Sequence, residues 1–202
     1  MRGFVVKNSS FLAWILRMNL IKRWSPMHLM KEENVAEHSH QVAVIAHLLA
    51  TIKNVYCGGQ ISPEKAATIA LYHEVSETKL QDINHVTKYS SPALTEEFKK
   101  IEDLAEIECL NTLPEKLKPL FKELVIQKQV DKEYKKLVKA ADVLTAYFKA
   151  CDELKFHNPE FVSVKKRLSD KVDAYKEEMP EVGVFMDLFE QNCLASLDDL
   201  SS

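Results

Sequence analysis

Glycine is the residue that this chain most clearly lacks. Only Gly3, Gly58, Gly59 and Gly183 occur among its 202 residues, whereas glycine makes up about 7% of an average protein. Phosphate-binding loops and the tight turns of β-rich folds depend on glycine backbone conformations. The scarcity argues against a dinucleotide-binding sheet, a Walker-type loop and a turn-rich β-sandwich. It predicts an all-α fold.

Length and charge narrow the class further. A chain of 202 residues with 46% hydrophobic content is large enough for one core, so we expect a single domain over 1–202. A formal net charge of −3 gives no general attraction for nucleic acid. The four cysteines form no C-x-x-C pair and are expected to be reduced thiols. The longest apolar stretch, 42–52, is too short to cross a bilayer. These features predict a soluble cytoplasmic protein without nucleic-acid or membrane partners.

Hydrophobic residues recur at spacings of three and four, which predicts about eight helices. Asn34 and Glu37 have the spacing of a capping box, and Ser62 followed by Pro63 is typical of a helix start. Between residues 77 and 91 no period persists, so we expect an irregular segment or a short helix with a loop, of the kind that often carries function. The expected helices span 10–20, 34–53, 63–73, 91–111, 114–128 and 131–156, with two more after 159 and 180.

The histidines are the first candidates for chemistry. His38 and His40 are two positions apart, so on a helix they point about 200° apart and cannot both face one ion. We expect at most one of them to bind a metal. His73 and Glu74 are followed by Glu77 where a zinc-protease helix needs its second histidine, which excludes that motif. His73, Glu74 and Glu77 remain as a histidine with two nearby carboxylates. This group fits a structural role and a metal site equally well.

Asp142 is the third candidate position. Its neighbours Ala140, Ala141 and Val143 are small and apolar, and a carboxylate on a buried face is costly unless it is paired or bound to a cation. A bridge from Asp142 to Lys139 is the alternative.

The order of a histidine, a histidine with an adjacent acid, and a distant helical aspartate resembles the HD-domain superfamily of metal-dependent phosphohydrolases. Arg23-Trp24, the stretches 33–39 (ENVAEHS) and 70–77 (ALYHEVSE), and 137–142 (LVKAAD) resemble the bacterial HD-domain 5'-deoxynucleotidase family over nearly the whole chain. The resemblance implies a helical HD-domain bundle, a homodimer, and release of phosphate from (deoxy)ribonucleoside 5'-monophosphates.

The resemblance also implies a role for each matching residue. His38, His73 and Asp142 would bind a divalent metal, with Glu74 as the fourth ligand; this ligand set suits cobalt, manganese, zinc or iron. The other roles fall on residues around this metal site, and His38 and Asp142 would also contact the substrate. Glu77 would act on the attacking water, Arg23 would hold the phosphate, Trp24 would pack against the nucleoside, and the loop of Asp82, Ile83, Asn84 and His85 would contact the sugar.

Two departures from the family pattern leave alternatives open. The family has aspartate where this chain has Glu74, and its loop reads Gly-Asp-Leu-Pro-Thr-Pro-x-Lys where this chain has QDINHVTK at 81–88. One alternative is therefore a catalytically impaired relative that binds nucleotide or metal without efficient turnover. Another keeps the chemistry but acts on phosphodiesters or signalling nucleotides, although no basic cluster for a polyphosphate is evident in the sequence. A helical interaction module without an active site is the least favoured.

Overall fold

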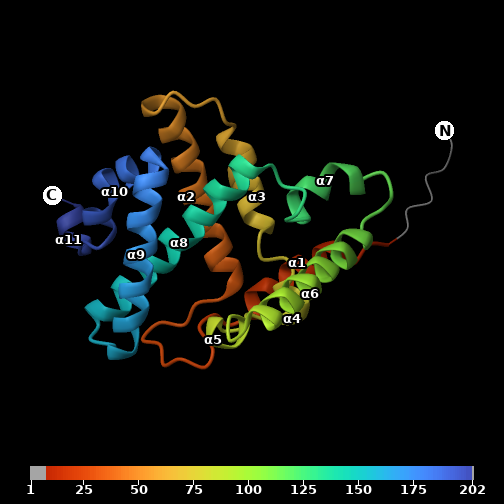
Figure 1. Ribbon diagram of the computed structural model, residues 1–202, viewed down its shortest axis with the longest axis horizontal. Coiled ribbons are helices and arrows are strands. Elements are labelled where there is room, and N and C mark those ends of the chain that lie inside the picture. Colours follow the sequence, from red (N-terminus) through yellow and green to blue (C-terminus); the bar gives the residue numbers. More distant parts are fainter. Residues whose placement is uncertain (1–7, 202) are drawn as a thin grey trace.

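The computed structural model describes residues 8–201, and its regular structure is helical (Figure 1). Within that range no β-strand forms, apart from one isolated bridge between Lys22 and Asn34. The all-α prediction is therefore confirmed; Gly3 and the two ends of the predicted 1–202 domain lie outside the described residues. The α-helices are α1 (Phe11–Ile15), α2 (Val35–Tyr56), α3 (Pro63–Tyr72), α4 (Glu77–Leu80), α5 (His85–Lys88), α6 (Pro92–Asn111), α7 (Lys118–Val125), α8 (Lys132–Lys155), α9 (Val162–Glu178), α10 (Pro180–Cys193) and α11 (Leu197–Leu200), with the 3-10 helices η1 (Leu16–Leu20) and η2 (Pro159–Phe161).

The predicted number of helices was too low. The described residues contain eleven α-helices and two 3-10 helices rather than about eight. Three of the additional elements, α4, α5 and α11, have four residues each, which is too short to show a hydrophobic period. The first predicted helix also divides, because the α-helix ends at Ile15 and continues as η1. The helix expected over 114–128 is limited to α7, since Pro119 fits only in its first turn.

Side-chain caps begin the long helices where the sequence predicted. The Asn34 side chain accepts a hydrogen bond from the Glu37 amide at 3.0 Å, and the Glu37 carboxylate accepts one from the Asn34 amide at 3.3 Å. Ser62, Ser91 and Asp131 each accept a hydrogen bond from a backbone amide in the first turn of α3, α6 and α8, without the reciprocal bond. These caps fix where α2, α3 and α8 begin, and so which of their residues face the core.

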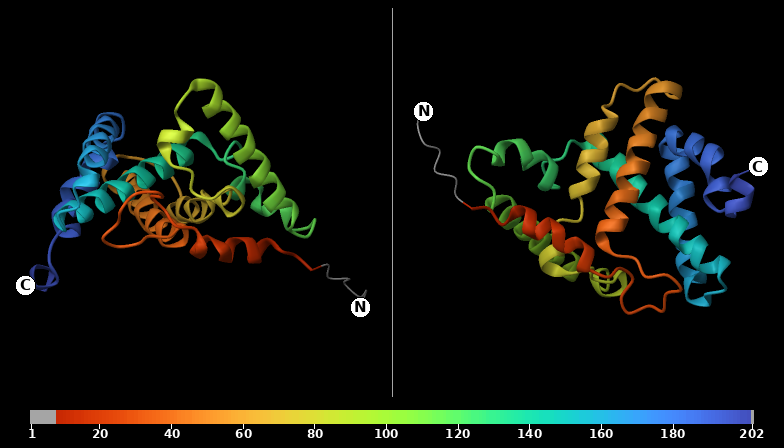
Figure 2. Two further views of the ribbon diagram at one scale, coloured as in Figure 1. Left: turned by 90° about the horizontal axis from the view of Figure 1, so that it is seen from below. Right: turned by 180° about the vertical axis from the view of Figure 1, so that it is seen from behind.

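The core has two parts. The larger packs α2, α3, α8, α9 and α10 together around buried residues such as Leu49, Leu144 and Phe185, with α2 between α10 and α6 in Figures 1 and 2. The smaller packs α1, α6 and α7 against Val75, just after α3. Residues 73–77 therefore lie where the two parts meet. None of the described helices has the length and hydropathy needed to cross a membrane.

The loop 21–34, which carries Arg23 and Trp24, is held by the end of α8. The buried Glu153 carboxylate accepts hydrogen bonds from the backbone amides of Met30 at 2.8 Å and Lys31 at 3.3 Å. It also accepts one from the Lys149 ammonium at 2.5 Å. Glu153 therefore fixes the loop relative to α8.

Replacing Glu153 with glutamine is expected to destabilise the fold by about 2–3 kcal/mol at pH 7, because Lys149 is left buried without its counter-charge. Burial opposes ionisation of Glu153, but hydrogen bonds from Lys149, Asn158 and two amides lower its pKa to about 2. Its contribution is therefore complete above the unfolded pKa of about 4.5 and is lost as the pH falls toward 2.

Urea denaturation at pH 7 and pH 3 tests this. The difference in the free energy of unfolding between wild type and Glu153→Gln should be smaller at pH 3 than at pH 7. Glu32→Gln is the control, since the exposed Lys22–Glu32 pair should contribute less than about 1 kcal/mol. Equal differences at the two pH values would contradict the role given to Glu153.

Candidate active site

Four side chains with metal-binding atoms converge where α2, α3 and α8 meet. His38 comes from α2, Asp142 from α8, and His73 and Glu74 from the end of α3. One ligand atom from each lies within 4.8 Å of all the others. His38 Nε2 is 3.1 Å from Asp142 Oδ1, and His73 Nε2 is 3.3 Å from Glu74 Oε1. The longer Glu74 side chain, which replaces the family's aspartate, therefore reaches the cluster.

The cluster leaves buried polar atoms unsatisfied. Within the described part of the chain, both ring nitrogens of His38, Nε2 of His73 and Oε2 of Glu77 make no hydrogen bond, because the close contacts of the two Nε2 atoms with Asp142 and Glu74 lack hydrogen-bond geometry. Such atoms are costly when buried. Because three of these four atoms are imidazole nitrogens beside two carboxylates, the donor set fits a divalent transition metal.

His38 has the protonation state that metal binding needs, and His73 has the tautomer. Burial, followed by the charge on Arg23, lowers the pKa of His38, so its ring is neutral at pH 7. His73 Nδ1 lies 2.6 Å from the Ala70 carbonyl oxygen, which can only accept, so Nδ1 carries the proton. Burial opposes protonation of His73, but the adjacent Glu74 carboxylate raises its pKa, so a metal would take the place of the proton on Nε2.

The two carboxylates of the cluster are ionised. Burial opposes this, but the adjacent His73 holds the pKa of Glu74 at about 2. Burial also opposes ionisation of Asp142, and Lys139 and His38 together hold its pKa well below the usual range. Asp142 Oδ1 faces His38 while Oδ2 accepts a hydrogen bond from Lys139 at 2.6 Å. The two roles considered for Asp142, membership of the cluster and a bridge to Lys139, therefore coexist.

His40 lies away from the cluster. Its side chain is exposed, whereas that of His38 is fully buried. The expectation that the two histidines cannot share one site is confirmed.

A cleft of about 290 Å³ opens above the cluster. It is lined by nine of the eleven residues that the sequence singled out, and the other two, His38 and His73, are buried against Asp142 and Glu74. The nine are Arg23, Trp24, Glu74, Glu77, Asp82, Ile83, Asn84, His85 and Asp142. The structure thus brings all the predicted site residues together.

Glu77 begins α4 at the wall of this cleft. Burial, and then the neighbouring charge of Glu74, raises its pKa well above the usual range. Its unpartnered Oε2 and its place beside the cluster suit a group that accepts a proton from water.

Arg23 and Trp24 are fixed by one carboxylate. Arg23 Nε donates to Glu33 Oε2 at 3.1 Å, and the Trp24 indole donates to the same oxygen at 2.7 Å. Burial opposes the charge on Arg23, but the carboxylates of Glu33 and Asp142 raise its pKa, so it stays cationic. Its terminal guanidinium nitrogens can therefore serve an anion in the cleft.

Trp24 also belongs to the core. Its ring packs edge-on against Phe161 with centroids 5.3 Å apart. Trp24 therefore both packs against the core and lines the cleft.

The loop after α4 is held by its own polar residues. Asp82 Oδ2 accepts a hydrogen bond from the Trp24 amide at 3.1 Å, and the Asn84 side chain caps α5. His85 contacts Arg167 of α9. Asp82 and Asn84 therefore also shape the cleft wall.

Several cations in the cleft were not predicted. Lys139, Arg167 and Lys171 line it beside Asp142 and His85. The last two are spaced along α9 among other charged residues, and no sequence signal separates them from an ordinary solvated helix face.

Gln81 adopts a backbone conformation that favours glycine, with φ 66° and ψ 170°. Replacing it with glycine is expected to stabilise the fold by about 1 kcal/mol, because the strain of a side chain in this region exceeds the entropy cost of glycine. Urea denaturation measures this. Gln81→Ala is the matched control, since it keeps Cβ and should give no comparable gain. A Gln81→Gly protein that is no more stable than Gln81→Ala would contradict the backbone strain assigned to position 81.

Comparisons with known proteins identify the family. A family model described as "5'-deoxynucleotidase YfbR-like" matches residues 10–193. The chain is 41% identical over 196 residues to a 5'-deoxynucleotidase of Vibrio vulnificus, covering 97% of this chain and 100% of that protein. It is 39% identical over 196 residues to the 5'-deoxynucleotidase YfbR of Escherichia coli K12, covering 97% and 98%.

Solved structures agree on the fold. An HD-domain phosphohydrolase from Listeria innocua superposes with a TM-score of 0.80 at 21% identity, covering 93% of this chain and 90% of that one. The HD phosphohydrolase DatZ of cyanophage S-2L, solved with dA and one catalytic Zn²⁺, gives 0.67 at 20% identity, covering 93% and 97%. These likenesses support the HD-domain architecture. On the family model and the full-length relatives, the chain belongs to the YfbR-like 5'-deoxynucleotidase family.

Proposed function

We propose that this chain is a metal-dependent 5'-nucleotidase that hydrolyses nucleoside 5'-monophosphates, with deoxyribonucleotides as its substrates. The observation that carries the proposal is the set of buried atoms of His38, His73 and Glu77 that make no hydrogen bond, beside a cleft lined by Arg23. The names of the relatives, 5'-deoxynucleotidases at 39–41% identity over nearly the whole chain, support the substrate class.

The reaction adds water across the phosphoester bond. Oxygen from water bonds to phosphorus, the bond from phosphorus to the 5' oxygen breaks, and that oxygen takes up a proton to leave as the nucleoside hydroxyl. A divalent cation held by His38, His73, Glu74 and Asp142 would supply a Lewis acid that activates water at neutral pH and offsets the charge of the phosphate.

The protein's own side chains supply the remaining parts. Glu77 orients the water and accepts its proton at Oε2. Arg23 binds the phosphate oxygens through the guanidinium nitrogens that Glu33 does not occupy. Trp24 provides an aromatic surface for the nucleoside, while Asp82, Ile83, Asn84 and His85 form the wall at the sugar.

A phosphate-release panel tests the proposal. Ribo- and deoxyribonucleoside 5'-monophosphates with each base are incubated with protein loaded with Co²⁺, Mn²⁺, Zn²⁺ or Fe²⁺. Release from the deoxyribonucleotides with at least one metal is expected. Release from no monophosphate with any of the four metals would contradict the proposal.

We also propose that the chain forms one domain and works as a homodimer in the cytoplasm. The family resemblance supports the dimer, and Leu12, Leu16 and Leu20 expose apolar side chains along α1 and η1. The unbridged cysteines suit a reducing compartment. Sedimentation equilibrium at micromolar concentration should give twice the mass of the chain.

A further inference from the structure

A second cavity adjoins the metal-binding cluster. It has a volume of about 630 Å³ and lies among α6, α8 and the segment between α7 and α8. His73 and Glu74 line it, and Glu74, Lys88 and Lys139 line both this cavity and the substrate cleft. The two spaces therefore meet at the cluster.

The second cavity is strongly basic. Seven of its sixteen lining residues are lysines and four are acidic. Some of these charges cancel locally, because Lys88 pairs with Glu102 and Lys128 pairs with Asp103. Lys136 and Lys139 are also paired, with Glu178 and Asp142, so the unpaired charge lies on the remaining three lysines.

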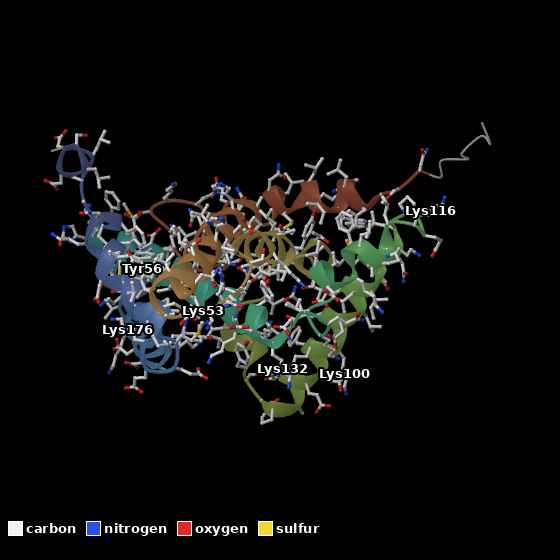
Figure 3. All side chains as sticks on the ribbon, turned by 90° about the horizontal axis from the view of Figure 1, so that it is seen from above. Lys53, Tyr56, Lys100, Lys116, Lys132 and Lys176 are labelled. Atoms are coloured by element: carbon white, nitrogen blue, oxygen red, sulfur yellow. The ribbon has the colours of Figure 1, made fainter. Side chains whose placement is uncertain are left out.

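Three exposed lysines of this cavity form no salt bridge with a carboxylate among the described residues. Lys99 on α6 and Lys132 at the start of α8 have no ion-pair partner within residues 8–201. Lys135 donates to the backbone carbonyl of Gln127 at 3.0 Å and makes no salt bridge, although its charge favours the ionised form of the nearby Glu106. Lys132 is labelled in Figure 3, as is Lys100, the neighbour of Lys99 in the sequence.

The wall of the cavity also holds an unused hydrogen-bond donor. The amide Nε2 of Gln127 is buried without a partner in the described part of the chain. The Gln127 backbone is fixed, since its amide donates to Glu106 Oε2 at 2.9 Å. A buried donor among unpaired ammonium groups suits a ligand rich in acceptor oxygens and negative charge.

We propose that this cavity is a second phosphate-binding site, distinct from the phosphate position at Arg23 in the cleft. A phosphate group has the charge to balance Lys99, Lys132 and Lys135 and the oxygens to accept from Gln127. It comes either as free inorganic phosphate or as part of a nucleotide's phosphate chain. The site extends the proposed function and does not depend on it.

No basic cluster was evident in the sequence, because the lysines of this cavity are far apart along the chain. The lysines come from α5, α6, the segment after α7, and α8, so they are dispersed between positions 88 and 139. Only the fold places them around one cavity.

Calorimetric titration of the metal-loaded protein with inorganic phosphate tests the proposal. Wild type should bind two phosphates per chain. The double variant Lys99→Gln/Lys132→Gln should lose one of them or bind it at least 10-fold more weakly. The control Lys100→Gln/Lys122→Gln makes the same change of charge at two exposed lysines outside the cavity and should keep both.

Two further measurements complete the test. Titrations with tripolyphosphate and ATP distinguish the two sources of phosphate. Tighter binding of ATP than of tripolyphosphate indicates a nucleotide ligand, and equal binding of the two indicates free phosphate. Phosphate release from deoxyribonucleotides at saturating substrate should be unchanged in the double variant, so the site is judged separately from the activity. A single phosphate in wild type, or equal binding by the double variant and its control, would overturn the proposal.

Discussion

Replacing His73 with alanine is expected to abolish phosphate release and to lower the affinity for divalent metal by about 100-fold or more. The variant removes one of the four proposed ligands, and even changes to residues behind a ligand cost about 10–100-fold in metal affinity. His73 sits where α3 ends, with Nδ1 held by the Ala70 carbonyl and Nε2 facing the cluster.

Metal content after dialysis and phosphate release from a deoxyribonucleotide are the measurements. His40→Ala is the matched control, because His40 lies two residues from His38 on α2 but is exposed. The control should retain both properties, and circular dichroism should show that both variants are folded. A folded His73→Ala protein that keeps its metal and its activity would contradict the ligand set.

Replacing Glu77 with glutamine is expected to lower kcat by about 10²–10⁴-fold, the range typical of a lost general acid or base. Glutamine keeps the shape of the side chain but cannot accept a proton. Because Glu77 is not one of the four clustered ligands, metal content should stay close to that of wild type. This separates its role from that of His73.

Steady-state kinetics on a deoxyribonucleoside monophosphate, with metal analysis of the same samples, measure the effect. Glu115→Gln is the control, since the Glu115 side chain is 87% exposed and should leave kcat unchanged. A Glu77→Gln enzyme with near wild-type kcat would show that another group handles the proton.

The helix framework could be predicted because its signals are local. The caps at Asn34, Ser62, Ser91 and Asp131 act within three residues of the chain, and a hydrophobic period is visible in any helix of several turns. One-turn helices such as α4 and α5 lack the full combination of a cap and a hydrophobic period. The sequence could therefore mark their region only as irregular.

The site could be predicted in its members but not in its geometry. The family pattern names His38, His73 and Asp142, yet only the fold shows that Glu74 reaches them and that Asp142 faces both His38 and Lys139. The cations on α9 had no local signal, because a lysine or arginine on a polar helix face looks the same whether it faces water or a cleft.

Gln81 shows the same limit. Its position in the family's glycine pattern could be read from the sequence, but the strained φ of 66° follows only from the turn between α4 and the loop.

The most direct test of the central claim is phosphate release from a deoxyribonucleoside 5'-monophosphate before chelation, after chelation and dialysis, and after stepwise return of Co²⁺, Mn²⁺, Zn²⁺ or Fe²⁺. We predict that activity is lost with the metal and returns with about one equivalent per chain, in keeping with a single four-ligand cluster. Activity that survives complete removal of divalent metal would contradict the claim that this cluster is the catalytic centre.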